Sequence, residues 1–170
     1  MESTETYRCD GCGAEYRVIG EKQPTVLCSE CNQVASPHGD PVAGREYRVG
    51  HVKYVEGRRR TTEAMERLES DHMTLARGGF DDAAAEFEDG VDHLTAAVKQ
   101  ANSDAVREAC ERARKKVTCL WQAVEWLGGA TYASEQGDPN RAARYREDAK
   151  QRLRAAKEYG ELVDPDDLTG

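Results

Sequence analysis

Four cysteines near the N-terminus place the strongest constraint on what this chain can fold into. Cys9 and Cys12 form one C-x2-C pair, and Cys28 and Cys31 form a second pair fifteen residues later. This is the spacing of a four-cysteine zinc site, in which one tight turn aims both sulfurs of a pair at the same tetrahedral ion. Because four thiolates leave no position for water or substrate, the spacing predicts one structural Zn²⁺ rather than a catalytic one.

The residues around the two pairs are typical of short strands. Residues 16–19 and 25–27 are rich in strand-forming side chains and are separated by a turn cluster at 20–24, which predicts a hairpin between the pairs. The segments YRCDGCGAEYRV and VLCSECNQ resemble the paired knuckles of the zinc-ribbon family. The resemblance implies a small β fold and a bound metal but no particular reaction. Rubredoxin-like iron and a disulfide framework are the alternatives, and His38 is expected in a linker rather than on the metal.

Composition narrows the class of protein further. No apolar run reaches 18 residues, and the N-terminus lacks a basic and an apolar region, so we expect a cytoplasmic protein without membrane contact. The net charge is −8, and the basic residues divide into 17 Arg and 7 Lys, with a single Ile in the chain. This pattern resembles that of proteins from salt-accumulating halophiles, in which acidic charge maintains solubility. The alternative is an ordinary, mildly acidic protein.

The segment 44–60, GREYRVGHVKYVEGRRR, is basic in an otherwise acidic chain. Valine and tyrosine alternate with charged residues in it, which predicts one or two extra strands or a linker. It is also a candidate nucleic-acid surface, with arginine and lysine for phosphate contacts and tyrosine for base stacking. The alternative is that the segment is a solvated linker, or that its arginine and lysine side chains pair with acidic residues of the following domain. The candidate residues are Arg45, Tyr47, Arg48, Lys53, Tyr54, Arg58, Arg59 and Arg60.

From residue 61 to 160 the apolar residues recur at helical spacing. This periodicity argues against disorder, although Leu, Ile, Val and Phe together supply only 25 of 170 residues. We expect a first helix that ends at Gly78–Gly79, a second that begins near Asp81, a third after a cap at Asn102 or Ser103, and a fourth over 140–159. Short connections between these four helices predict an up-and-down order.

Part of the second helix resembles another family. In residues 78–91 a glycine, two aromatic residues and two small residues match the second half of a tetratricopeptide repeat, at Gly78, Phe80, Ala83, Phe87 and Gly90. The resemblance implies a scaffold that binds peptides in a helical groove. The alternative is ordinary helix packing with alanine at tight crossings.

Together these patterns predict a small β zinc ribbon followed by an all-α antiparallel domain, either a four-helix or a tetratricopeptide-like arrangement. The expected divisions are a ribbon at 1–43, a basic linker or extra strands at 44–60, the helical domain at 61–160 and a tail at 161–170. The sequence contains no P-loop, dinucleotide fingerprint, nucleophile elbow or H-E-x-x-H motif, so we expect neither an enzyme nor a small-molecule substrate. The expected function is that of an adaptor that binds a protein partner or its own copy. The alternative is a nucleic-acid-binding regulator that uses segment 44–60.

Overall fold

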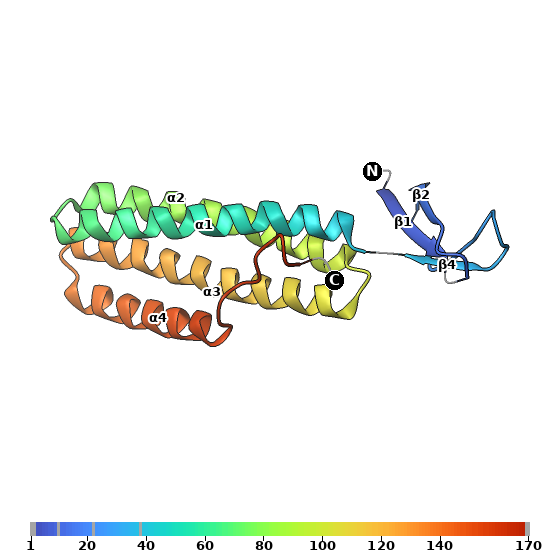
Figure 1. Cartoon of the computed structure of the whole chain (residues 1–170). Helices are drawn as coiled ribbons and strands as arrows, with labels where there is room; N and C mark the ends of the chain where they lie inside the picture. The colour runs from blue at the N-terminus through green and yellow to red at the C-terminus, as the bar shows by residue number, and fades with distance from the viewer. Residues whose placement is uncertain (1–2, 10, 22, 38, 169–170) are drawn as a thin grey trace.

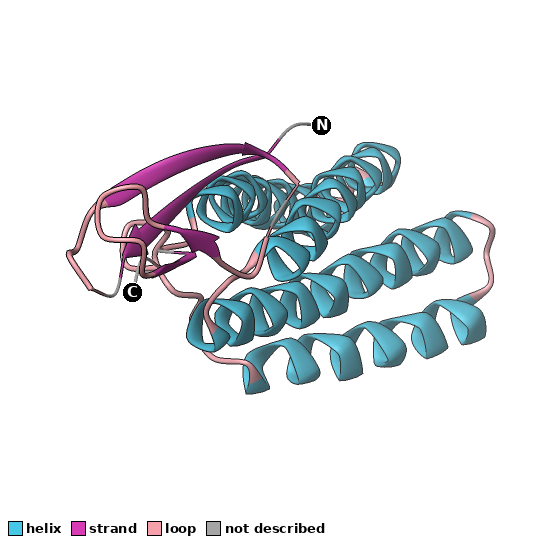
Figure 2. Ribbon diagram, turned by 90° about the vertical axis from the view of Figure 1, so that its right-hand side faces the viewer, coloured by secondary structure: helices cyan, strands magenta, loops and turns pink. Residues whose placement is uncertain are grey.

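The computed structural model describes residues 3–9, 11–21, 23–37 and 39–168, and it places a small β-sheet at one end of four long helices (Figure 1). The strands are β1 (Ser3–Cys9), β2 (Glu15–Gly20), β3 (Val26–Leu27) and β4 (Val34–Pro37). The helices are α1 (Pro41–Glu69), α2 (Met73–Gln100), α3 (Asp104–Glu135) and α4 (Pro139–Glu158). Figure 2 shows the same division between the sheet and the helices from the side. His38 lies outside the described residues, within which no helix combines the length and the apolar character needed to cross a membrane.

The sheet is antiparallel with strand order β2-β1-β4-β3, so the predicted hairpin between residues 16–19 and 25–27 is wrong. These segments form the two outer strands, and each pairs with the strand on the other side of its own cysteine turn. The physical reason is that each C-x2-C turn reverses the chain, so the strands before and after it become neighbours. Strands β1 and β4 then join the two hairpins through pairs such as Cys9 with Ala35.

The segment 44–60 is helical throughout, which corrects the expected strands or linker. The buried residues of α1 recur every three, four or seven positions: Ala43, Tyr47, Gly50, Tyr54, Gly57 and Ala64. The valines that suggested a strand pattern, Val49 and Val52, are exposed. Glycine at the contact lets α2 approach closely, because a Cβ built on Gly57 would lie 2.6 Å from the ring of Phe87.

The boundary between the first two helices lies earlier than expected. Helix α1 ends at Glu69, Asp71 adopts a left-handed conformation with φ of 64°, and Gly78 and Gly79 lie inside α2. Gly79 does not end a helix but accommodates Ala64 of α1, since a Cβ there would lie 2.9 Å from the Ala64 Cβ. Helices of 29 and 28 residues do not fit a repeat of about 34 residues that contains two helices, so the helical body is not a tetratricopeptide array.

The third and fourth helices begin where the sequence predicts them. The Ser103 hydroxyl accepts a hydrogen bond from the Val106 amide at 3.2 Å and so caps α3. Gly137, with φ of 73°, ends the preceding turn, and Asp138 caps α4. Helix α4 contacts α3 through three alanines spaced by seven residues, Ala142, Ala149 and Ala156, which are its only buried residues.

The helices pack in chain order, α1 on α2, α2 on α3 and α3 on α4, and the described residues show no comparable interface between α1 and α4. The four predicted helices are therefore present and pack in chain order, but the layer does not close into a ring of four helices. A strip of α3 is left between α1 and α4.

The segment after α4 packs back on the helices rather than extending away as a tail (Figure 1). The Tyr47 hydroxyl donates a hydrogen bond to the carbonyl of Val163 at 2.7 Å, and Leu168 is buried in the core. On the ribbon side, the Asp40 carboxylate accepts hydrogen bonds from the backbone amides of Asn102 and Ser103. The chain that connects the sheet to α1 is thereby attached to the loop before α3.

Candidate metal centre

The two cysteine pairs meet at one point between the hairpins. The four Sγ atoms of Cys9, Cys12, Cys28 and Cys31 all lie within 4.8 Å of one another. The Sγ atoms of Cys9 and Cys31 are 3.3 Å apart, and those of Cys12 and Cys28 are 3.6 Å apart. All six cysteines of the chain are free, so the disulfide alternative is not what the structure contains. The cluster is a candidate metal centre, as the spacing predicted.

Each pair is held by the same local backbone geometry. In the first turn the Gly13 amide donates to the Cys9 carbonyl at 2.9 Å, and in the second the Asn32 amide donates to the Cys28 carbonyl at 2.9 Å. Gly13 and Asn32 both have positive φ, 75° and 57°, a conformation that glycine and asparagine tolerate best. In each turn this backbone geometry brings together two cysteines that are separated by two residues.

The donor set fits a tetrahedral thiolate-bound ion. With metal–sulfur bonds of about 2.3 Å, sulfurs at the corners of a tetrahedron are about 3.8 Å apart. The separations of 3.3 and 3.6 Å are slightly below this value, and all others are at most 4.8 Å, so the four sulfurs are near enough to share one ion. Cys9 and Cys28 are buried whereas Cys12 and Cys31 are exposed, so the centre lies at the surface of the sheet.

A tyrosine supports one of the four sulfurs. The Tyr16 hydroxyl of β2 lies 2.9 Å from the Cys28 Sγ, in position to donate a hydrogen bond to a thiolate. This hydrogen bond is the largest cause that lowers the pKa of Cys28 to about 6, and it outweighs burial, which raises the pKa. The Tyr16 hydroxyl therefore favours the thiolate form of Cys28. The cysteine spacing did not predict that Tyr16 contacts a sulfur. The sequence did place Tyr16 in a strand close to the first cysteine pair.

We expect Tyr16→Phe to make the centre release its metal at a higher pH. The hydrogen bond stabilises the thiolate, so its loss raises the pKa of Cys28 and lets protons compete for the sulfur earlier during acidification. The midpoint of metal release should rise by about half a unit to one unit. The measurement is the thiolate–metal charge-transfer absorbance of the cobalt-loaded protein during acid titration. Tyr7→Phe is the control, because its hydroxyl binds the Gln23 carbonyl and no sulfur; equal shifts in both variants would contradict the role of Tyr16.

The residues predicted to contact nucleic acid do not form one accessible surface. Tyr47 and Tyr54, expected to stack on bases, are 0% and 4% exposed and belong to the helical core. Their burial follows from the helical period of α1, which turns both rings toward its neighbours. The stacking role assigned to them is therefore wrong in this fold.

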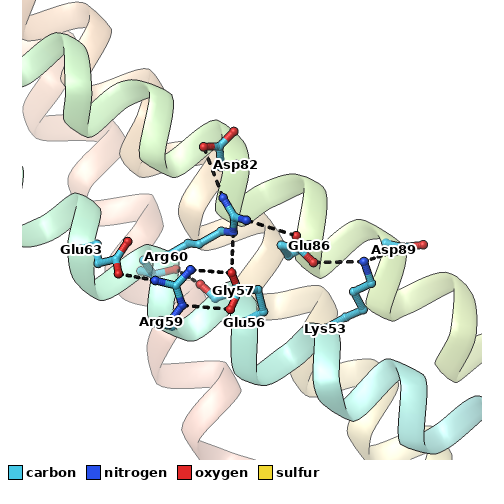
Figure 3. A network of polar contacts seen from close by, with 10 residues as sticks. Lys53, Glu56, Gly57, Arg59, Arg60, Glu63, Asp82, Glu86 and Asp89 are labelled. Atoms are coloured by element: carbon cyan, nitrogen blue, oxygen red, sulfur yellow. Dashed lines mark hydrogen bonds and ion pairs between the residues drawn. The ribbon is translucent and has the colours of Figure 1, made fainter.

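Most of the bases in this segment are paired with acids of α1 and α2 (Figure 3). Lys53 lies 2.8 Å from Asp89 and 3.3 Å from Glu86. Arg59 lies 2.6 Å from Glu56 and holds the pKa of that carboxyl at about 2. The remaining contacts of the network are Arg59 with Glu63, and Arg60 with Glu56, Asp82 and Glu86. Three cations thus face five carboxylates, which leaves this surface acidic overall.

The other predicted bases are dispersed. Arg48 pairs with Asp166 at 2.6 Å, Arg58 donates to the Tyr54 hydroxyl at 3.1 Å, and Arg45 is exposed. The structure therefore favours the alternative stated for this segment, in which its bases pair with acids of the helical body.

A groove between α1 and α4 is the feature that sequence analysis missed. One part, about 430 Å³, is lined by apolar side chains of three helices, among them Met65, Leu68, Leu127 and Leu153. An adjoining part, about 330 Å³, shares Leu153 and extends toward Tyr54 and Leu120. The apolar positions were visible as helix faces, but only the open packing order leaves them uncovered.

The helix that forms one wall of this groove is strongly basic. Helix α4 contains seven Arg or Lys residues and three Asp or Glu residues, in a chain whose net charge is −8. Among the described residues, none of its bases forms an ion pair within 4.0 Å, in contrast to those of α1. The bases are Arg141, Arg144, Arg146, Lys150, Arg152, Arg154 and Lys157.

Comparison with known proteins adds no relative: the chain matches no family model, and no curated protein or solved structure shows significant similarity to it.

Proposed function

We propose that this protein is a non-enzymatic zinc-ribbon adaptor whose helical body binds a protein partner. The observation that carries the proposal is the groove between α1 and α4, because partly exposed apolar side chains of three helices line it along one strip. Contiguous apolar surface of this kind is typical of sites at which soluble proteins bind partners. A helix laid into such a groove is a recurrent mode of peptide recognition.

In this proposal the cysteine centre holds one structural Zn²⁺ and stabilises the small sheet. Support comes from the all-sulfur donor set, the two similar turns and the hairpin attached to each turn, which are features of zinc ribbons. Rubredoxin-like iron at this centre would differ from zinc in its visible absorbance. Six free cysteines suit a reducing compartment such as the cytoplasm. The acidic, arginine-rich composition suits a halophilic host, in which high salt would strengthen apolar docking.

The structure supports the nucleic-acid alternative less than the sequence does. Its two stacking residues are buried, and three of its six bases face an excess of carboxylates. Phosphate binding would have to use α4 instead, whose bases form no ion pair within 4.0 Å with the residues that the structure describes.

The proposal is tested by affinity capture of the tagged full-length protein from its own cells at native salt, with half of the sample treated with nuclease. A Leu153→Asp variant places a charge in the groove, and Val52→Asp is the matched control because Val52 is 60% exposed on α1 outside the groove. We expect one protein partner that survives nuclease and is retained by the control but lost from Leu153→Asp. Equal recovery by both variants would refute the groove as the binding site, and loss of all partners after nuclease would favour nucleic acid.

A further inference from the structure

We propose that the groove binds an acidic amphipathic helix of about four turns from a partner protein. This inference rests on the proposed function and specifies the chemistry of the partner. Its basis is the shape of the groove, the charge of its rim and the segment of this chain that already lies beside it.

The shape of the groove sets the length of the occupant. Its α1 wall runs from Tyr54 to Leu68 along one helix face, through Arg58, Thr61 and Met65. Fourteen residues of α-helix rise about 21 Å, so a straight helix of about 14 residues would fill the wall. Leu120 and Leu127 of α3 form the floor, and Leu153 of α4 belongs to both parts of the groove. Apolar anchors of the occupant at i, i+3, i+4 and i+7 would meet this floor.

The charge of the rim sets the sign of the occupant. Five basic residues line the two parts of the groove, and Glu161 is the single acid among its described lining residues. Among the described residues none of these five bases pairs with a carboxylate within 4.0 Å. Four of them are exposed, whereas Lys116 is buried, 9% exposed, and donates to the Gly160 carbonyl. The five bases are Arg58, Lys116, Arg146, Lys150 and Lys157.

This rim differs from the rest of the molecule. The bases on the opposite side of α1 are neutralised by acids of α1 and α2: Lys53 and Arg60 pair with acids of α2, and Arg59 pairs with Glu56 of its own helix (Figure 3). A chain with 32 acidic residues that leaves these five bases without acidic partners has a surface complementary to an acidic ligand.

The C-terminal segment of the chain shows the same chemistry in contact with the same helices. Residues 161–168, ELVDPDDL, contain four acids and no base, and they follow the end of the groove at Glu161. Leu162, Val163 and Leu168 pack on the core, while Asp166 pairs with Arg48 of α1 at 2.6 Å. Helices α1 and α3 thus already hold an acidic segment by apolar anchors, and the vacant groove offers the same combination alongside α4.

A peptide helix fits this site better than a nucleic acid. The floor is aliphatic, and Tyr54, the aromatic residue among its lining residues, is 4% exposed with its hydroxyl accepting from Arg58. The nucleobases of a single-stranded nucleic acid would find no exposed ring among the described lining residues to stack on. The leucine side chains of a peptide helix, in contrast, would be buried against the aliphatic floor. Nucleic acid is therefore an outcome of the test rather than the proposal.

The test uses the full-length, metal-loaded protein and two fluorescein-labelled helical peptides of about sixteen residues. Both carry leucine at i, i+3, i+4 and i+7, and the remaining positions are mostly glutamate in one and mostly lysine in the other. Fluorescence anisotropy should show saturable binding of the glutamate peptide alone. Lys150→Glu with Lys157→Glu should weaken it at least about tenfold, whereas Arg45→Glu with Arg141→Glu, exposed bases outside the groove and equal in charge change, should alter it less than about twofold. Circular dichroism verifies that each variant keeps its helices.

Each other result overturns a defined part of the inference. If both peptides bind equally and Leu153→Asp abolishes both, the groove binds helices but the acidic preference is wrong. If neither peptide binds, the inference fails, and the capture experiment with Leu153→Asp decides the proposed function separately. If a single-stranded oligonucleotide binds more tightly than the glutamate peptide and loses affinity in the Lys150/Lys157 variant, the basic rim serves nucleic acid instead.

Discussion

Replacing Cys28 with serine is expected to unfold the sheet while the helical body stays folded. The sheet has a buried cluster of four residues, Tyr7, Cys9, Cys28 and Ala35, and two of these are the cysteines themselves. Such a cluster is too small to offset the conformational entropy of about 35 residues. A structural zinc contributes about 10 to 16 kcal/mol in comparable small domains, so with the zinc ion that we propose for this centre, loss of one cysteine ligand removes the main term that stabilises the sheet.

The helical body has a separate core and should keep its structure. Its buried cluster extends from Ala43 to Leu168 and includes none of the four metal-site cysteines. The measurement combines metal content by mass spectrometry with amide resonances of residues 3–37, which should collapse to unfolded positions while helical ellipticity persists. Cys119→Ser is the control, since Cys119 lies in α3. A Cys28→Ser protein that retained stoichiometric metal and dispersed resonances would show that the centre is wrongly assigned.

Replacing Gly57 with alanine is expected to destabilise the helical body even though alanine is the better helix former. The new Cβ would lie 2.6 Å from the Phe87 ring, which is 1% exposed, so the ring or the helix must shift within the packed core. Overpacking of this kind costs about 1 to 3 kcal/mol, which exceeds the gain of about 0.5 to 1 kcal/mol from helix propensity. The net free energy of unfolding should fall by about 1 to 2 kcal/mol.

The same substitution at Gly44 should have the opposite sign. Gly44 lies in the same helix, and a Cβ built there meets no atom within 4 Å, so only the propensity gain remains. Urea denaturation followed by circular dichroism measures both variants. If Gly57→Ala proved as stabilising as Gly44→Ala, the close approach of α1 and α2 at this point would be wrong.

The helical phase of α1 shows how far sequence patterns carry. Its contact positions do recur at helical spacing, but they are glycine, alanine and tyrosine. These residues give a weak signal in a search for apolar periodicity, which depends on large apolar side chains. Over the eight residues 47–54, tyrosine and valine alternate with charged residues on either side of Gly50, which fits a strand equally well. The helix forms because α2 presents Phe87 and Leu94 where α1 has Gly57 and Gly50, a complementarity that exists only after the two helices meet.

The charged groups of segment 44–60 illustrate the same limit. Seven bases in seventeen residues, counting His51, suggest a phosphate-binding surface when they are considered alone. Their partners Asp82, Glu86 and Asp89 lie more than twenty residues later in the chain. The packing of α1 on α2 brings these acids to Lys53 and Arg60, whereas Arg59 pairs with Glu56 and Glu63 of its own helix. Within the described part of the chain, the bases of α4, at the edge of the layer, form no ion pair within 4.0 Å.

The sequence by itself determined the candidate metal site, the cap of α3 and the start of α4. Each of these depends on residues within a few positions of one another: two C-x2-C turns, Ser103 with Val106, and Gly137 before Asp138. Only the tertiary structure decided the strand pairing, the phase of α1 and the groove between α1 and α4. These depend on which distant segments become neighbours, and that choice is made by shape and charge complementarity across helices rather than by local conformational preference.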